Sequence, residues 1–415
     1  MVSEVIADGY NCISGKCKTH WFAAINILKD TDREFTEDIL DPCVDGKVEL
    51  LPGKNLLEWE NASVSQPEEL LFIEETADGI NKKVLTEAER ISEPATVKEA
   101  TVQPVIAWCE RNNQKWILKF KKGESVENIY ESSKMLRSPA IISHNGTYLI
   151  AVEMDETDKT VIHIFTEKGA EYFKAKGRKP ALSSSGNYLY VVSEVSKNGV
   201  SEIGLQLTEI SQGVPSNDII LKSDGININC DMVFNPETGN LNIAWESTPW
   251  WGEDPFVGWH RDINYLALES GNIGVSGRIN TGEKIDVSQS APVNPCFFVK
   301  NSTPVLAYRC VNDACSFGWD TYVTYKNGKE WSSARKVSEK AGPPDSKYTI
   351  LFHRDRAIGF FPVCDSKPTP KCHRAYNHRV EIKEIEGIFE SSRRASTPVH
   401  IKEKIIAKFL IQLKI

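Results

Sequence analysis

A two-strand pattern recurs along most of this chain, and it limits the possible folds more than any other feature. Each copy has a short apolar run, a turn containing Gly, Asn, Asp or Pro, and a second, stronger apolar run. The clearest copies lie at 138–153, 179–194, 230–246, 294–309 and 347–362, while 93–110 fits less neatly. A second hairpin follows several of them, at 159–173, 263–277 and 321–337. A period of roughly 40–60 residues with four strands per unit is typical of β-propeller blades.

One four-stranded blade cannot bury both of its faces, whereas blades stacked around an axis cover one another. We therefore predict an all-β fold, a β-propeller of four-stranded antiparallel blades, most simply with seven blades and with six or eight as alternatives. The whole chain, 1–415, is predicted to be one propeller domain, with repeats clearest at 93–390 and at least one more blade within 20–92. The tail 391–415 alternates apolar and polar residues like a ring-closing strand, although its pattern also allows a helix.

Charge and hydropathy exclude two kinds of partner. The formal net charge is −8, and the chain contains no basic block, so we do not expect nucleic acid as a ligand. It also contains no apolar run of about 18 residues, so we expect no membrane span. The first ten residues lack the basic and apolar regions of a signal peptide as written.

Ten cysteines, an even number, include three closely spaced pairs that could each staple a small loop: Cys12 with Cys17, Cys310 with Cys315, and Cys364 with Cys372. Disulfides of this kind favour an extracellular or secreted protein. Unpaired buried thiols are the first alternative. Zinc is the second, because His20 and His373 follow two of the pairs.

No cofactor is predicted, and a structural cation such as calcium at blade-end carboxylates is left open. Three Asn-x-Ser/Thr sequons, at Asn61, Asn145 and Asn301, are no more than a chain of this length carries by chance.

Blade geometry predicts where polar side chains converge. The innermost strand of a blade begins at the face where the next strand ends, so these ends meet near the axis. The charged or polar residues at such positions are Arg137, Arg178 and Asn294 at strand starts, and Glu110, Glu153, Glu194, Glu246 and Arg309 at strand ends. Several charges around one mouth could bind an oriented polar ligand. The alternative is that each is a polar cap bonded to neighbouring backbone.

Three long loops are expected to open on the same face, at 247–261, 310–320 and 363–377. Their aromatic and charged residues include Trp250, Trp251, Trp259, Trp319, His373, Arg374 and Tyr376. Tryptophan faces stack on sugar rings, and long loops on a rigid scaffold often carry function. These loops could instead form a docking rim for a protein partner, or their tryptophans could simply pack the loops.

Two segments resemble the sialidase-like, BNR-repeat propellers. The hairpin TYKNGKEWSS at 324–333 is similar to an Asp-box, with Asn327, Gly328 and Trp331 near the expected places and the Ser and Asp replaced. The segment 239–272 resembles BNR-type polysaccharide-degrading propellers, with Ile243–Trp245 followed by His260, Arg261, Asp262 and Tyr265. The Arg-x-Pro motifs at Arg137 and Arg178 resemble the strand-start arginine of sialidases. The resemblance implies a propeller that acts on or binds glycans.

We therefore predict a carbohydrate-active propeller that binds or acts on an acidic glycan at its central mouth, as a lyase-like or glycosidase-like enzyme. A lyase needs a base, an acid and an arginine that neutralises the uronate. The residues that could supply these are His260, Arg261, Tyr265, Arg309, His373 and Tyr376. The predicted substrate-binding residues are Arg137, Arg178, Glu153, Glu194, Glu246, Trp250, Trp251, Trp259, Trp319 and Arg374. A non-catalytic glycan-binding lectin and a protein-interaction scaffold are the alternatives, because propellers host all three functions.

Overall fold

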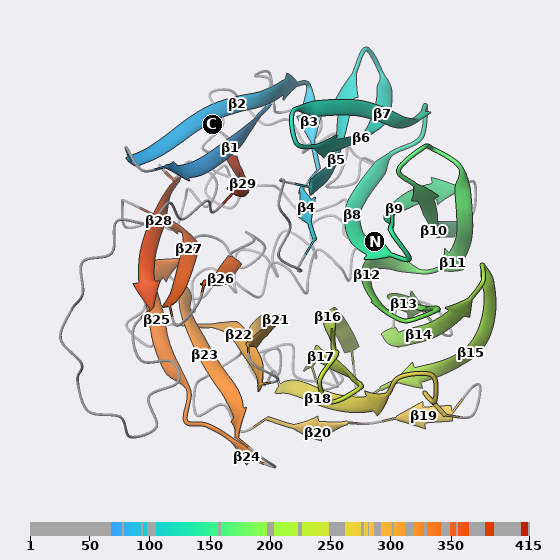
Figure 1. Ribbon diagram of the computed structural model, residues 1–415, viewed down its shortest axis with the longest axis vertical. Coiled ribbons are helices and arrows are strands. Elements are labelled where there is room, and N and C mark those ends of the chain that lie inside the picture. Colours follow the sequence, from blue (N-terminus) through green and yellow to red (C-terminus); the bar gives the residue numbers. More distant parts are fainter. Residues whose placement is uncertain are drawn as a thin grey trace, which may run out of the picture.

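A computed structural model describes residues 68–385 and 408–413, apart from gaps at 77–78, 93, 98–104, 157–158, 197–202, 223–225, 249–261, 275–277, 281, 286–291, 301–302, 312–318, 328–329, 342–348, 354–355 and 365–377. Every regular element in this part of the chain is a β-strand. Figure 1 shows the strands grouped in sheets around a central axis, which confirms the predicted β-propeller.

The first half of the ring contains two short sheets and two complete blades. The first sheet holds β1 (Glu68–Thr76) and β2 (Gly79–Ala88). The second holds β3 (Arg90–Ile91), β4 (Ala95–Thr96), β5 (Val105–Asn112), β6 (Lys115–Lys122) and β7 (Ser125–Ser132). The next two blades are β8 (Leu136–His144), β9 (Thr147–Glu156), β10 (Lys159–Thr166) and β11 (Glu171–Lys176), then β12 (Arg178–Ser185), β13 (Tyr188–Ser196), β14 (Ile203–Ser211) and β15 (Val214–Leu221).

The second half continues in the same order. One blade holds β16 (Ile226–Asn235), β17 (Asn240–Thr248), β18 (Asp262–Glu269) and β20 (Glu283–Lys284), while β19 (Arg278–Asn280) pairs in parallel with β15 of the preceding blade. The next contains β21 (Val293–Lys300), β22 (Thr303–Val311), β23 (Trp319–Asn327), β24 (Glu330–Trp331) and β25 (Arg335–Ala341). The last contains β26 (Thr349–His353), β27 (Arg356–Cys364) and β28 (His378–Ile385).

The described strands form six hydrogen-bonded sheets, and the largest joins β21–β25 to β26–β28 through a single bridge between Ala341 and Val363. Dividing that sheet at the bridge gives seven groups around the axis, which agrees with the predicted seven blades; the blade count itself stays a prediction. The tail contributes β29 (Lys408–Leu413), which pairs antiparallel with β1, beside it in Figure 1. The single-domain assignment of 1–415 also stays a prediction.

Hydrophobic cores lie between neighbouring blades and explain why the inner strands are so apolar. On β9, residues 149–154 are all buried, as expected for a strand covered on both faces. Ile150 and Val152 pack toward β5 and β6, whereas Leu149 and Ala151 pack toward β12 and β13. Outer strands differ: β11 has only one buried residue among six. Each blade is therefore stabilised by the two beside it.

The Asp-box-like hairpin places its tryptophan in one of these cores. Trp331 on β24 contacts the Tyr265 ring edge to face, with ring centroids 5.0 Å apart, and lies 6.5 Å from the Phe297 ring. Lys326 Nζ lies 4.2 Å from the centre of the Tyr265 ring and 2.6 Å from a carboxylate oxygen of Glu283. The hairpin thus joins its own blade to the one before it.

Gly282 makes the same interface sensitive to a single methyl group. Its φ is +64°, and a Cβ there would lie 2.6 Å from Trp245 Cη2 and 2.8 Å from the Tyr265 carbonyl oxygen. We expect Gly282→Ala to lower the free energy of unfolding by about 2–4 kcal/mol, because the left-handed backbone and the clash both cost energy. Gly146, with φ +77° and nothing within 4 Å of its Cβ position, is the matched control. Gly146→Ala should cost only the backbone part, about 1–2 kcal/mol. Equal losses in urea unfolding of the two variants would contradict the clash.

Candidate functional site

Four consecutive blades begin with the same backbone irregularity. The register between inner strand and neighbour shifts after Arg137, Arg178, Ile228 and Val293. The residue that follows each has a left-handed backbone, with φ of 49° at Ser138, 47° at Lys179, 51° at Asn229 and 50° at Asn294. Such conformations are uncommon outside glycine and cost energy, so the surroundings must hold them in place.

At three of the four bulges, a buried glutamate from the preceding blade does this. Glu153 Oε2 accepts a hydrogen bond from the backbone N–H of Lys179 at 3.0 Å, and Glu194 Oε1 accepts one from Asn229 at 2.9 Å. Glu246 Oε2 accepts from the Asn294 N–H at 3.3 Å and from Asn229 Nδ2 at 2.9 Å. All three glutamates are at most 2% exposed. Each carboxylate therefore ties the end of one blade to the start of the next.

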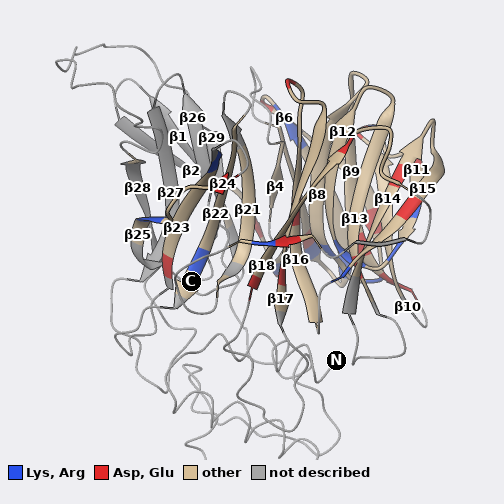
Figure 2. Ribbon diagram, turned by 90° about the horizontal axis from the view of Figure 1, so that it is seen from below, with Lys and Arg blue, Asp and Glu red and all other residues tan. Residues whose placement is uncertain are grey.

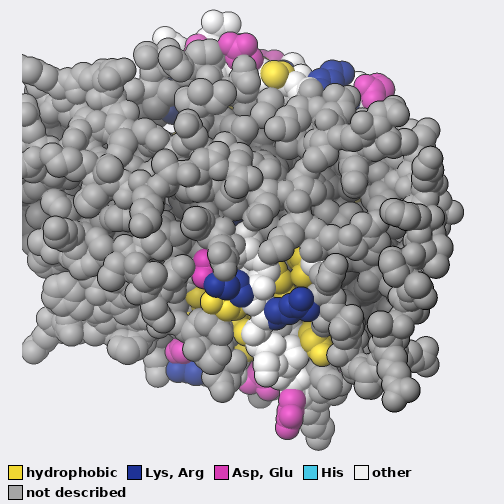
Figure 3. Space-filling model, turned by 90° about the vertical axis from the view of Figure 1, so that its left-hand side faces the viewer, with side chains coloured by type: hydrophobic (Ala, Val, Ile, Leu, Met, Phe, Trp, Pro, Cys, Tyr) yellow, Lys and Arg dark blue, Asp and Glu magenta, His cyan; other side chains and the backbone are white. Residues whose placement is uncertain are grey.

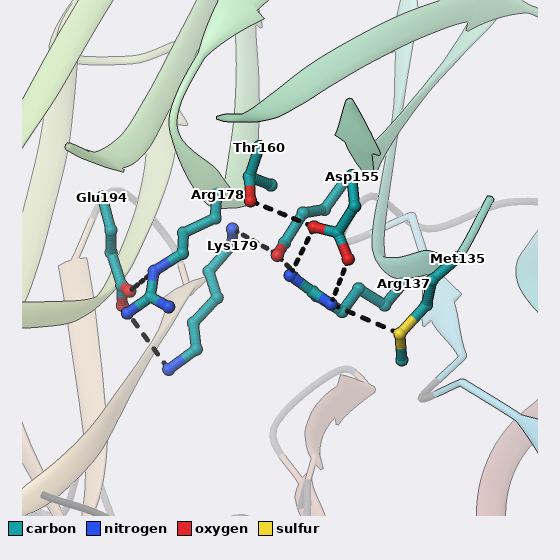
Figure 4. Close-up of polar contacts among 8 residues, drawn as sticks. Met135, Arg137, Asp155, Thr160, Arg178, Lys179 and Glu194 are labelled. Carbon is teal, nitrogen blue, oxygen red and sulfur yellow. Dashed lines mark hydrogen bonds and ion pairs between the residues drawn. The ribbon is translucent and has the colours of Figure 1, made fainter. Parts of the chain in front are cut away.

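Basic side chains bind the same carboxylates. Arg137 donates from Nε to Glu153 Oε1 at 2.5 Å and from both terminal nitrogens to Asp155, each at 3.0 Å. Arg178 Nε lies 3.3 Å from Glu194 Oε2, and Lys179 Nζ lies 3.7 Å from Glu194 Oε1. We call this set the rim network: Arg137, Glu153, Asp155, Arg178, Lys179, Glu194, Asn229, Glu246 and Asn294. Figure 4 shows its arginines and lysine pointing toward the carboxylates of β9 and β13.

Arg137 and Arg178 make different contacts with the carboxylates beside them. Arg137 uses all three guanidinium nitrogens on two carboxylates. Burial lowers the pKa of Arg137, but the charges of Glu153 and Asp155 outweigh this effect and raise the pKa above its ordinary value. Around Glu194, by contrast, two cations lie at one carboxylate. Both remain partly exposed there, with Lys179 41% exposed and Arg178 19% exposed.

The rim network contains Arg137, Arg178, Glu153, Glu194 and Glu246, which were predicted as substrate-binding residues. The three glutamates tie neighbouring blades together, whereas the two arginines contact carboxylates of their own blades. The role of all five residues in binding substrate stays a prediction. Asp155, Lys179 and Asn229 were missed. Asp155 follows Glu153 by two positions and therefore lies on the same side of β9. Asn229 stands at the bulge position of Lys179, where asparagine tolerates a left-handed backbone.

Glu110 was expected at the same mouth, but the structure places it on the other side of its blade. Its oxygens accept hydrogen bonds from Thr86 Oγ1 at 3.0 Å and Trp108 Nε1 at 2.9 Å. β5 reads Ile-Ala-Trp-Cys-Glu where β17 reads Ile-Ala-Trp-Glu, so Cys109 occupies the position of Glu246. A shift of one residue turns the side chain toward the preceding blade.

Arg309 occupies the glutamate position on β22, where it pairs with Val293 and Thr321 across the sheet and is fully buried. Tyr265 is 4% exposed and donates from its hydroxyl to Asn242 Oδ1 at 2.8 Å. The contacts of Tyr265 are with Asn242, Phe297, Lys326 and Trp331, and none of these belongs to the rim network. The proposed catalytic roles of Arg309 and Tyr265 stay predictions.

The environment of Tyr265 has a consequence for stability at high pH. Burial, and secondarily the charge of Glu283, raise its pKa from 10.0 to about 12. A raised pKa in the folded state means that the stability contributed by the neutral phenol is present below pH 10 and lost between about pH 10 and 12. We expect urea unfolding to show this loss in the wild type and less of it in Tyr265→Phe. A wild-type curve parallel to that of the variant over this range would contradict the shift.

The remaining predicted site residues lie outside the described residues: His260, Arg261, Trp250, Trp251, Trp259, His373, Arg374 and Tyr376. Trp319 begins β23, but only its backbone is described. The centres of all three long loops are likewise outside the described part.

The predicted Cys310–Cys315 staple is not present, because Cys310 is a free thiol. Its side chain is fully buried in the core between β17, β18 and β22 rather than turned toward the loop that follows. Burial and the charge of Asp320 raise the pKa of this thiol well above its ordinary value, so it is unreactive at neutral pH. Cys109 is also a free thiol.

Two further searches cover only the described residues. No cluster of three or more His, Cys, Asp or Glu side chains there is arranged to hold a metal ion. In the same part of the chain, no helix is long and apolar enough to cross a membrane. Figure 2 shows acidic and basic positions interspersed along the strands, and Figure 3 shows described basic side chains beside hydrophobic ones on one side of the ring.

No family model matches the chain, and no curated protein matches it. Solved structures with a similar backbone fold include the α-L-arabinanase of Penicillium chrysogenum complexed with arabinobiose. Its sequence identity to this chain is 11%, the match covers 77% of this chain and 97% of that chain, and the TM-score is 0.49. The α-L-arabinofuranosidase of Fusarium graminearum with arabinobiose has 12% identity, coverages of 71% and 93%, and a TM-score of 0.45. The hemagglutinin-neuraminidase of parainfluenza virus 5 has 8% identity, coverages of 70% and 88%, and a TM-score of 0.43. At these values the fold assignment rests on the strands themselves.

Proposed function

We propose that this chain is a carbohydrate-active propeller of the sialidase-like kind that binds an acidic glycan at the rim network. The observation that carries the proposal is that two cations, Arg178 and Lys179, lie at the buried carboxylate of Glu194 and remain partly exposed, at 19% and 41%. Both side chains can therefore meet a carboxylate on a sugar from solution. Charge-assisted hydrogen bonds of this kind are among the strongest that proteins make.

The two cations are also held in place before any ligand arrives. Arg178 is fixed through Nε to Glu194, and Lys179 has its backbone N–H bound to Glu153 of the neighbouring blade. Ordering side chains on binding costs free energy, so cations that are already ordered favour affinity. Arg137 is less suited to the ligand, because its three nitrogens are engaged by Glu153 and Asp155.

Binding is the part of the proposal that the described residues support most directly. Tyr265 holds its proton firmly, since its pKa is raised to about 12 by burial and Glu283, and it is not poised to act as a base at neutral pH. Turnover, lyase-like or glycosidase-like, would depend on His260, His373 and Tyr376 of the long loops.

The test is a screen of the purified full chain against uronate-containing, sialylated and neutral glycans. The same panel is immobilised to measure binding and kept in solution to follow unsaturated uronate products and new reducing ends. We expect acidic glycans to bind and neutral ones of equal length to bind at least tenfold more weakly. Equal binding of both sets, or binding of neither, would overturn the proposal. Turnover by the wild type that is lost in His260→Ala or His373→Ala would support a catalytic role in addition to binding.

A further inference from the structure

The hairpin between β8 and β9 presents an asparagine in an unusually open position. Its two-residue turn is Asn145-Gly146, with φ of 49° and 77°, and both residues are exposed. Positive φ at both central residues is the backbone of a type I′ turn, which Asn-Gly favours. His144 and Thr147 pair across the strands on either side of this turn. The turn is therefore a fixed, outward-pointing tip.

Thr147 completes an Asn-Gly-Thr sequon at this tip. The number of sequons in the chain does not show whether any of them is glycosylated. The position of this one is informative, because a glycan needs a surface turn with room around it. Nothing lies within 4 Å of a Cβ built on Gly146. The neighbouring backbone is anchored, since Ser184 Oγ of β12 donates to the Ser143 carbonyl at 2.9 Å. A bulky group could extend from the tip without disturbing the packing beneath it.

The side-chain amide of Asn145 is also compatible with substitution. Its Nδ2 lies 3.3 Å from His144 Nε2. Burial lowers the pKa of His144, which keeps the imidazole neutral and able to accept a hydrogen bond. An N-glycosylated asparagine retains one N–H on Nδ2, so the amide can still donate one hydrogen bond after the modification.

We propose that Asn145 is an N-glycosylation site. In the reaction, Asn145 Nδ2 forms a bond to the anomeric carbon of an oligosaccharide carried on a lipid pyrophosphate. The bond from that carbon to the pyrophosphate oxygen breaks, the lipid pyrophosphate leaves with its electron pair, and the amide loses one proton. The modification requires that the chain pass through a secretory pathway, as its predicted extracellular location implies.

The glycan would leave the rim network accessible. Arg137 is near the start of β8 and Asn145 follows its end, so eight residues at roughly 3.3 Å each place them about 26 Å apart along the strand. The two ends of the blade would thus carry different functions: ligand binding at one, a covalent glycan at the other. The inference does not depend on the proposed function.

The test is peptide mapping of the full chain purified from its natural source. The chain is treated in heavy-oxygen water with and without an N-glycosidase, which converts a glycosylated asparagine to labelled aspartate. The sample without enzyme measures the spontaneous deamidation to which Asn-Gly is prone. We expect enzyme-dependent label at Asn145. Equal label at Asn145 with and without the enzyme would overturn the proposal, whatever is found at Asn61 and Asn301.

Variants secreted from a eukaryotic host give a second, independent readout. Asn145→Gln and Thr147→Ala should each remove one glycan from the intact mass, while Thr147→Ser, which keeps the sequon, should retain it. Wild type and Asn145→Gln with the same glycan mass would contradict the assignment. Because the tip is far from the rim network, binding of acidic glycans should be unchanged in Asn145→Gln.

Discussion

Replacing Glu153 by alanine is expected to lower the free energy of unfolding by about 3–5 kcal/mol, since removing one partner of a buried ion pair leaves the other uncompensated. Glu153 is 2% exposed and binds Arg137 with one oxygen and the Lys179 backbone N–H with the other. Alanine removes both contacts and with them the tie between two blades. Urea unfolding followed by circular dichroism measures the loss.

Two further variants make the result specific. Glu153→Gln keeps an acceptor for the Lys179 N–H but loses the charge, so its loss should be smaller than that of alanine. Glu131→Ala removes a carboxylate that is 52% exposed and 3.8 Å from Lys115 Nζ, and exposed pairs contribute at most about 1 kcal/mol. If Glu153→Ala is no less stable than Glu131→Ala, then the buried carboxylate does not hold the blades together.

Arg178→Ala is expected to weaken the binding of uronate-containing glycans by roughly 10- to 100-fold. The estimate corresponds to about 1.5–3 kcal/mol for hydrogen bonds to a charged group. Arg178→Lys keeps the charge without the planar pair of donors, so an intermediate affinity is expected. Titration calorimetry with one acidic oligosaccharide and its neutral counterpart measures the change.

The control is Arg335→Ala, which removes an exposed arginine from the outer strand β25. It should leave the affinity for the acidic glycan unchanged. Because Arg178 also contacts Glu194, the melting temperature of each variant is measured alongside binding. Full affinity in a folded Arg178→Ala protein would show that the acidic ligand binds elsewhere.

The architecture could be predicted from the sequence because the inner hairpins carry a strong local pattern. The predicted repeat at 138–153 corresponds to β8 and β9, and that at 294–309 to β21 and β22. Strands buried on both faces need continuous apolar runs, and the turns between them need residues that accept positive φ. Both requirements can be recognised in the amino-acid sequence alone.

The site was only partly predictable, because its contacts join residues of different blades. Glu153, Glu194 and Glu246 could be found as charged strand ends, but their partners are backbone N–H groups at bulges, which no side-chain pattern reveals. The Cys310 staple was wrong for a related reason. The four residues between Cys310 and Cys315 suggested a stapled loop. In the structure Cys310 belongs to strand β22, and its side chain lies on the face that packs into the core.

At three bulges the bond to the preceding blade is made by the main chain and not by the side chain. The identity of the side chain at these positions is therefore not fixed by that bond. Lysine at 179 and asparagine at 229 and 294 satisfy the same architectural need. An engineer could therefore vary these positions to change what the propeller recognises, as one changes the loops of an antibody, while the neighbouring glutamates are left untouched. Proline alone is unsuitable, since it lacks the N–H on which the bond depends.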